Sequence, residues 1–148
     1  MAYMKDIKSS TGIVHLLDPQ DLAHTDTVSS ILDTHEFNGA MILVSVGALT
    51  GVDASNYLTP VLQESDTTTG TDFEAVDSGD IIGGFSKIDA AAEDSTTQAA
   101  CYIGTKRYIR VNLDYTGTLI TAGVVGVVGI LGRPEMAPAS APAAVSAV

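Results

Sequence analysis

The chain has 148 residues, of which 45% are hydrophobic and 17% charged, and its formal net charge is −11. This length fits a single domain with a hydrophobic core of its own. So acidic a protein is not expected to bind nucleic acid through a phosphate-neutralising surface or to be attracted to an anionic membrane.

The first half of the chain predicts an N-terminal arm followed by short strands. Residues 1–11 are expected to form a flexible or partner-docked arm. The apolar run Gly12–Leu17 predicts a short strand that ends at Asp18-Pro19, a turn signal. Asn38-Gly39 is a strong hairpin signal, and the apolar run Ala40–Ala48 that follows predicts a strand buried on both faces.

The second half contains the clearest strand pattern. Ala90–Ala100 has helix propensity and predicts at most one helical turn. Cys101–Tyr115 predicts one strand with a bulge near Gly104-Thr105. The Gly-punctuated apolar run Leu119–Leu131 is expected to return antiparallel to it as the closing hairpin. Close packing between strands explains its regularly spaced glycines best.

These short strands and frequent turns predict an all-β fold. We expect a single-domain β-sandwich, with a jelly roll or a β-tulip as its specific form, over residues 12–134. Residues 135–148 are rich in Pro, Ala and Ser and predict a disordered tail. Neither a signal peptide nor a transmembrane helix is expected.

No residue set predicts catalysis, cofactor binding or a metal centre, and we expect that the protein is not an enzyme. The histidines His15, His24 and His35 lie in no triad or metal-binding motif. The single cysteine, Cys101, excludes an intrachain disulfide and predicts a buried packing thiol. Segment 77–80 (DSGD) offers oxygen ligands to Ca²⁺, but Asp and Ser beside Gly are also ordinary turn residues. The turn is the favoured interpretation.

A basic cluster stands out in this acidic chain. Lys106, Arg107 and Arg110 are three of its seven Lys and Arg residues. They either balance acidic neighbours and protect a strand edge, or form an interface patch that meets carboxylates of an adjacent subunit. Both interpretations remain open at this point.

Three segments together resemble the structural proteins encoded in tailed-bacteriophage head modules, capsid decoration (cement) proteins in particular. They read AMILVSVGALTG from residue 40, YLTPVLQESDTTTGTDFEAV from residue 57 and YIGTKRYIRV from residue 102. The resemblance implies a β-sandwich, jelly roll or β-tulip that binds the outer surface of the capsid and stabilises it.

The resemblance also implies partners and a location. The partner would be the major capsid protein, contacted by residues 1–11 with Lys5 and Lys8 as the charges of the arm. The protein would be a homotrimer on the capsid exterior, synthesised in the cytoplasm of the bacterial host, without cofactor, nucleic acid or membrane. The alternatives are a head-fibre base, a tail or connector component, and a β-sandwich module that binds host glycans.

Overall fold

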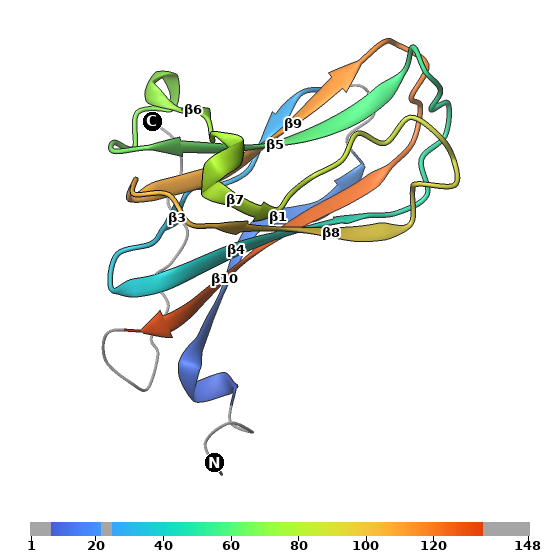
Figure 1. The fold of residues 1–148 in the computed structure, drawn as a ribbon. Coiled ribbons are helices and arrows are strands. Elements are labelled where there is room, and N and C mark those ends of the chain that lie inside the picture. The colour runs from blue at the N-terminus through green and yellow to red at the C-terminus, as the bar shows by residue number, and fades with distance from the viewer. Residues whose placement is uncertain (1–6, 22–24, 135–148) are drawn as a thin grey trace.

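The computed structural model describes residues 7–21 and 25–134, which form two antiparallel β-sheets packed face to face (Figure 1). The all-β sandwich predicted from the sequence is confirmed. Residues 1–6 of the predicted arm and the predicted tail, 135–148, lie outside the described residues. The strands are β1 (Thr11–Asp21), β2 (Thr27–Val28), β3 (Leu32–Asp33), β4 (Phe37–Val46), β5 (Tyr57–Ser65), β6 (Glu74–Ala75), β7 (Ile81–Gly83), β8 (Thr96–Tyr102), β9 (Tyr108–Thr116) and β10 (Val124–Pro134). Within the described residues, 3-10 turns accompany them at η2 (Lys8–Ser10), η3 (Gly70–Asp72) and η4 (Ser78–Asp80).

The strand order is that of a jelly roll. The first sheet, sheet A, has the order β1-β10-β4-β8-β7, and the second, sheet B, has the order β2-β9-β5-β6 with β3 also paired to β9. Strands from the two halves of the chain pair antiparallel: β1 with β10, β2 and β3 with β9, and β4 with β8. A long two-stranded ribbon rolled into two sheets has this pattern.

The predicted closing hairpin is wrong. Cys101–Tyr115 is not one bulged strand, because β8 ends at Tyr102 in sheet A and β9 begins at Tyr108 in sheet B. The loop between them, residues 103–107, crosses from one sheet to the other. The run Leu119–Leu131 then contributes to β10, which pairs with β1 and β4 rather than with β9.

Three local predictions also need correction. Asn38-Gly39 is no hairpin turn, because it lies inside β4 with Gly39 opposite Gly132. The chain turns just before, where Glu36 has a positive φ of 70°. In Ala40–Ala48 only alternate residues of β4 are buried, so one face of the strand is open rather than covered. Most of the predicted helical segment Ala90–Ala100 is turn and the start of β8.

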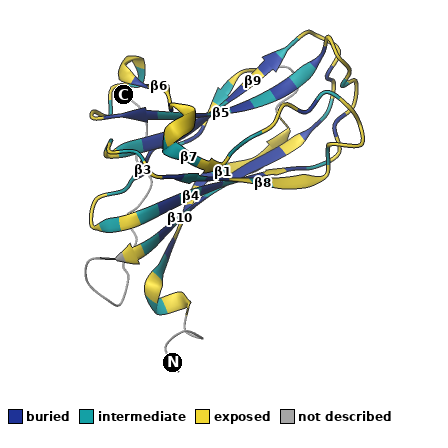
Figure 2. Ribbon diagram, viewed as in Figure 1, coloured by how far each residue is buried: buried dark blue, intermediate teal, exposed yellow. Residues whose placement is uncertain are grey.

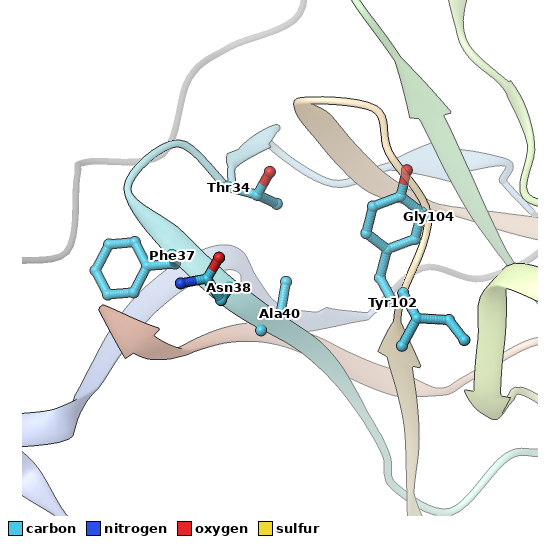
Figure 3. A pocket seen from close by; sticks show the side chains of 8 residues that line it. Thr34, Phe37, Asn38, Ala40, Tyr102 and Gly104 are labelled. Carbon is cyan, nitrogen blue, oxygen red and sulfur yellow. The ribbon is translucent and has the colours of Figure 1, made fainter. Parts of the chain in front are cut away.

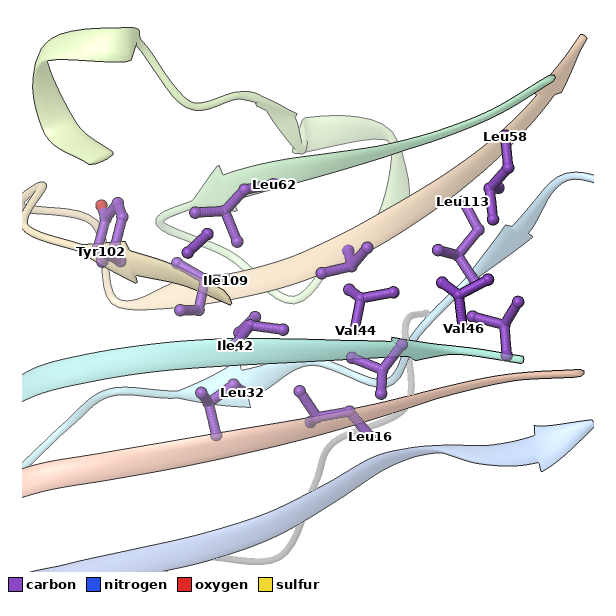
Figure 4. Packing of buried hydrophobic residues seen from close by; sticks show 14 of the residues in the cluster. Leu16, Leu32, Ile42, Val44, Val46, Leu58, Leu62, Tyr102, Ile109 and Leu113 are labelled. Atoms are coloured by element: carbon purple, nitrogen blue, oxygen red, sulfur yellow. The ribbon is translucent and has the colours of Figure 1, made fainter. Parts of the chain in front are cut away.

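The core lies between the sheets and is filled by the inward-facing side chains of both. Ile42 and Val44 of β4 and Ile109 and Leu113 of β9 have no exposed surface, and Figure 4 shows side chains of the two sheets pointing toward one another. Burying such a side chain contributes about 1.5–3 kcal/mol. Exposed residues gather in the connecting loops (Figure 2). The packed core holds these loops in place at the two ends of the sandwich.

Glycines of β10 allow close packing, as the sequence predicted. A Cβ atom on Gly129 would lie 2.9 Å from a methyl group of Leu32, and one on Gly126 would lie 3.2 Å from the ring of Pro19. Pro19 belongs to β1, which continues past the predicted Asp18-Pro19 stop with two register shifts. The glycines therefore let β1 and the core side chains approach the backbone of β10.

Candidate functional site

The basic cluster lies at one end of the sandwich, where loops from both sheets meet. We name this the ion-pair end and define it as loops 34–36, 66–69 and 103–107. Lys106 and Arg107 belong to the third of these loops, and Arg110 lies in β9 just after it. The three basic residues are thus close in the fold, but each has a different environment.

Arg107 joins the third loop to sheet B through a two-pronged ion pair. Its Nε donates to Oδ1 of Asp33 at 2.9 Å, and its terminal nitrogen donates to Oδ2 of the same carboxylate at 2.7 Å. This hydrogen bonding by the guanidinium holds the pKa of Asp33 below its ordinary value. The backbone carbonyl of Arg107 also accepts from the N–H and hydroxyl groups of Thr34. Loops 34–36 and 103–107 are therefore fixed to each other.

Lys106 joins the third loop to the second. Its Nζ lies 2.5 Å from Oδ2 of Asp66, and this carboxylate raises the pKa of the lysine. Asp66 is largely exposed and Lys106 is about one-third exposed, so the pair is screened by solvent and contributes little stability. It serves to orient the two loops toward each other.

Arg110 is buried and is held by neutral groups. Its Nε donates to the Gln63 side chain at 2.9 Å, and a terminal nitrogen donates to the Gly70 carbonyl at 3.0 Å. The guanidinium also lies 4.1 Å from the centre of the Phe73 ring, within range of a cation–π interaction. Because only 7% of Arg110 is exposed, it stabilises the 70–73 segment rather than offering charge to a partner.

A buried tyrosine supports the base of the ion-pair end. The Tyr102 hydroxyl donates to the Glu64 carboxylate and accepts from the N–H of Lys106 at 2.8 Å. Burial raises the pKa of Tyr102, so the hydroxyl keeps its proton as a donor. A Cβ atom on Gly104 would lie only 2.5 Å from this hydroxyl, so the loop needs glycine at that position.

A shallow hollow lies beside these loops. Figure 3 shows it between the start of β4 and the end of β8, with Thr34, Phe37, Asn38 and Tyr102 among its lining residues. Its volume is about 170 Å³, below the roughly 300–1,000 Å³ of typical small-molecule sites. The hollow therefore fits a side chain of a partner better than a whole ligand.

The other residues singled out in the sequence are the two lysines of the N-terminal arm and the acidic segment 77–80. Lys8 is exposed in η2, just before β1, and Lys5 lies outside the described residues. Segment 77–80 forms η4 and the turn that enters β7, in agreement with the prediction that it is a turn. Within residues 7–21 and 25–134, no group of three or more His, Cys, Asp or Glu side chains is placed to hold a metal ion. No helix in these same ranges is long and apolar enough to cross a membrane.

Sequence reasoning identified the basic residues but missed their partners. Asp33 precedes Arg107 by 74 residues, and Asp66 precedes Lys106 by 40. The partners of Lys106 and Arg107 are carboxylates of the same chain, which agrees with the charge balance of the first interpretation. The rest of that interpretation does not fit, because Arg110 is buried against neutral groups and β9 lies inside sheet B rather than at its edge. A contact of these residues with an adjacent subunit stays a prediction. Only the strand pairing brings these partners together, and no local pattern marks it.

Comparison with known proteins gives structural likeness alone. No family model matches the chain, and no curated protein matches it in sequence. Among solved structures, the CBM22-1–GH10 modules of the Clostridium thermocellum endo-1,4-β-D-xylanase 10B are 11% identical, with a TM-score of 0.43 over 86% of this chain and 29% of that one. A protein of the disulfide-linked pili of Bacillus endospore appendages is 14% identical, with a TM-score of 0.41 over 84% of this chain and 89% of that one. The EclA C-terminal domain, a sugar-binding protein, is 10% identical, with a TM-score of 0.44 over 82% of this chain and 78% of that one. The present chain thus spans less than one-third of the xylanase chain, and at such low scores nothing about function follows from these matches.

Proposed function

We propose that this protein is a structural component of a bacteriophage virion that binds the outer surface of the capsid and stabilises it. The observation that carries the proposal is the ion-pair end, where Arg107–Asp33 and Lys106–Asp66 fix loops of both sheets into one polar rim. A preformed rim binds a protein surface with little ordering cost. The hollow beside it is too small for a typical ligand, which favours a protein partner over a substrate.

The sequence resemblance to capsid decoration proteins supplies the partner and place in this proposal. The partner is the major capsid protein, and the place is the exterior of the capsid. Attachment as an oligomer multiplies weak contacts through effective concentration. In this proposal the N-terminal arm, with Lys5 and Lys8, contacts the shell beside the ion-pair end. The protein acts by binding, without catalysis.

Co-sedimentation with phage heads that lack this protein tests the proposal. Purified full-length protein should bind saturably, at hundreds of copies per head, and the bound heads should resist heat better than the bare ones. Saturation at a dozen copies or fewer would instead indicate a connector or tail component. Absence of binding to intact heads would overturn the proposal, and a glycan array would then test the carbohydrate-binding alternative.

Three variants locate the binding surface. Lys5→Ala with Lys8→Ala removes the charges of the arm, and Lys106→Ala with Arg107→Ala removes those of the ion-pair end. Lys87→Ala is the matched control, since this lysine pairs with Asp89 near Tyr57, at the opposite end of β5. Each double variant should weaken binding while the control binds like the wild type. Equal loss in all three would indicate a nonspecific charge effect.

A further inference from the structure

The outer face of sheet A carries a continuous apolar row. The strand registers align one residue from each of the five strands, in the order Ile13, Ile130, Met41, Cys101 and Ile82. The sequence neighbours of the three central residues are buried, so these residues point to the other face, outward. The two ends of the row are well exposed, Ile13 at 65% and Ile82 at 60%. Cys101, predicted to be buried, is partly exposed within the row.

A second row beside it extends the same surface. His15, Val128, Leu43 and Ala99 are aligned by the same registers across β1, β10, β4 and β8. On the other side of the first row, Gly132 and Gly39 are paired and have no side chain that would rise above the sheet. At about 4.8 Å per strand and about 7 Å per row, the eleven positions of these three rows cover roughly 370 Å². Exposed apolar patches of this size commonly mark interaction sites.

The charge pattern indicates which partner fits this face. The chain has 18 acidic residues and a net charge of −11, yet the first row contains no Asp, Glu, Lys or Arg, and the second row has a carboxylate beside it only at its β1 end, where Asp18 lies 2.7 Å from His15. A basic partner would be attracted to the acidic surfaces elsewhere. A second copy, which is equally acidic, is repelled by those surfaces and can approach closely only where carboxylates are missing.

We propose that the outer face of sheet A is the surface through which one copy of this protein packs against another. Two sheets packed face to face lie about 10 Å apart, and side chains such as Ile13 and Ile82 fill the space between them. The apolar rows form the centre of a contact that needs about 800 Å² per copy, and polar residues at the margin of the sheet supply its rim.

Sedimentation equilibrium of the purified full-length protein tests this inference without any capsid, so its outcome is independent of shell binding. The wild type should have a mass that is a multiple of 15.3 kDa. Ile13→Glu and Ile82→Glu should each shift the equilibrium to the single chain, because both place a carboxylate on the face. Leu119→Glu is the matched control, since Leu119 is 58% exposed but lies in the loop between β9 and β10.

Two outcomes of this measurement would overturn the inference. One is a wild type of single-chain mass at every concentration, and the other is an Ile13→Glu variant that assembles as well as Leu119→Glu. Circular dichroism of each variant verifies the fold. Because the mutated side chains are well exposed, we expect the spectra to be unchanged.

Two further readouts separate an apolar contact from a charged one. Added salt screens the repulsion between acidic copies, so it should strengthen assembly. Weaker assembly in high salt would indicate ion pairs instead and would contradict the inference. Cys101 is the only cysteine, so the rate at which a maleimide labels it reports on this face. That rate should fall several-fold as the wild-type concentration rises but not for Ile13→Glu, and a constant wild-type rate would overturn the inference.

Discussion

Asn56 is buried between two loops at the end of the sandwich opposite the ion-pair end. Its Oδ1 accepts hydrogen bonds from the backbone N–H groups of Thr118 and Leu119, at 3.0 and 3.1 Å. Its Nδ2 donates to Asp53 at 3.0 Å. One amide side chain thus satisfies donors of the loop that follows β9 and an acceptor of its own loop. Buried donors that lose such a partner destabilise a fold markedly.

Replacing this amide should therefore be costly. We expect Asn56→Ala to lower the free energy of unfolding by about 2 kcal/mol, because two N–H groups lose their acceptor. Urea denaturation measures the change. Asn38→Ala is the control, since Asn38 is exposed and makes one long hydrogen bond of 3.4 Å. It should change stability by less than about 0.5 kcal/mol. Equal losses in the two variants would contradict this role for Asn56.

The Asp33–Arg107 ion pair makes stability depend on pH. Because Arg107 holds the pKa of Asp33 below the ordinary 3.8, the folded state favours the ionised carboxylate. That stabilisation is present above the unfolded-state pKa and is lost as pH falls through the folded-state pKa. We expect Asp33→Asn to destabilise the protein by about 0.5–1 kcal/mol near neutral pH, since Arg107 is half exposed, and by almost nothing near pH ~2. Denaturation at both pH values checks this. A loss of equal size at both would indicate a cause other than the ion pair.

At the scale of strands, the sequence predicted their presence better than their pairing. The apolar runs Ala40–Ala48 and Leu119–Leu131 correctly marked β4 and β10. The prediction failed where the chain crosses from β8 in sheet A to β9 in sheet B, because the sequence of residues 103–107 resembles a bulge within one strand. The partners of Arg107 and Lys106 were missed for the same reason: the pairing that brings them together is far in sequence. The apolar rows of sheet A were missed too, because they appear only when five registers are aligned.

Two glycines of β10 offer a matched test of strand packing. A Cβ atom on Gly129 would contact both Leu32 and Leu16 in the core, whereas one on Gly132 would have nothing within 4 Å. We expect Gly129→Ala to destabilise the protein by about 1–3 kcal/mol through overpacking. Gly132→Ala should be neutral or slightly stabilising, because alanine restricts the unfolded chain more than glycine does. Thermal unfolding of the two variants compares them, and a neutral Gly129→Ala would show that the core adapts.

At the scale of the whole molecule, the two sheets share one core and cannot separate. From β4 onward the long strands β4, β5, β8, β9 and β10 alternate between the two sheets, and between β1 and β4, which both lie in sheet A, the chain passes through β2 and β3 of sheet B. Each sheet buries its apolar face only against the other. Neither sheet is therefore expected to be stable alone.

We predict that the protein unfolds in a single cooperative step. Tyr102 lies in sheet A and Tyr115 in sheet B, so tyrosine fluorescence reports on both, and the chain has no tryptophan to mask it. The fluorescence transition should coincide with that of far-ultraviolet circular dichroism. Two separate midpoints would mean that one sheet unfolds before the other.

The pairing of β1 with β10 has a consequence for biosynthesis. β1 leaves the ribosome before β10, its hydrogen-bonding partner in sheet A, and all the other strands of the two sheets lie between them in the sequence. β4 likewise waits for β8 and β10 on its two sides. Because these contacts are so distant in sequence, the sandwich has to fold after synthesis has passed residue 134, and slowly for its size. Until then the nascent chain exposes apolar strands with unpaired backbone groups, which makes it prone to aggregation during synthesis.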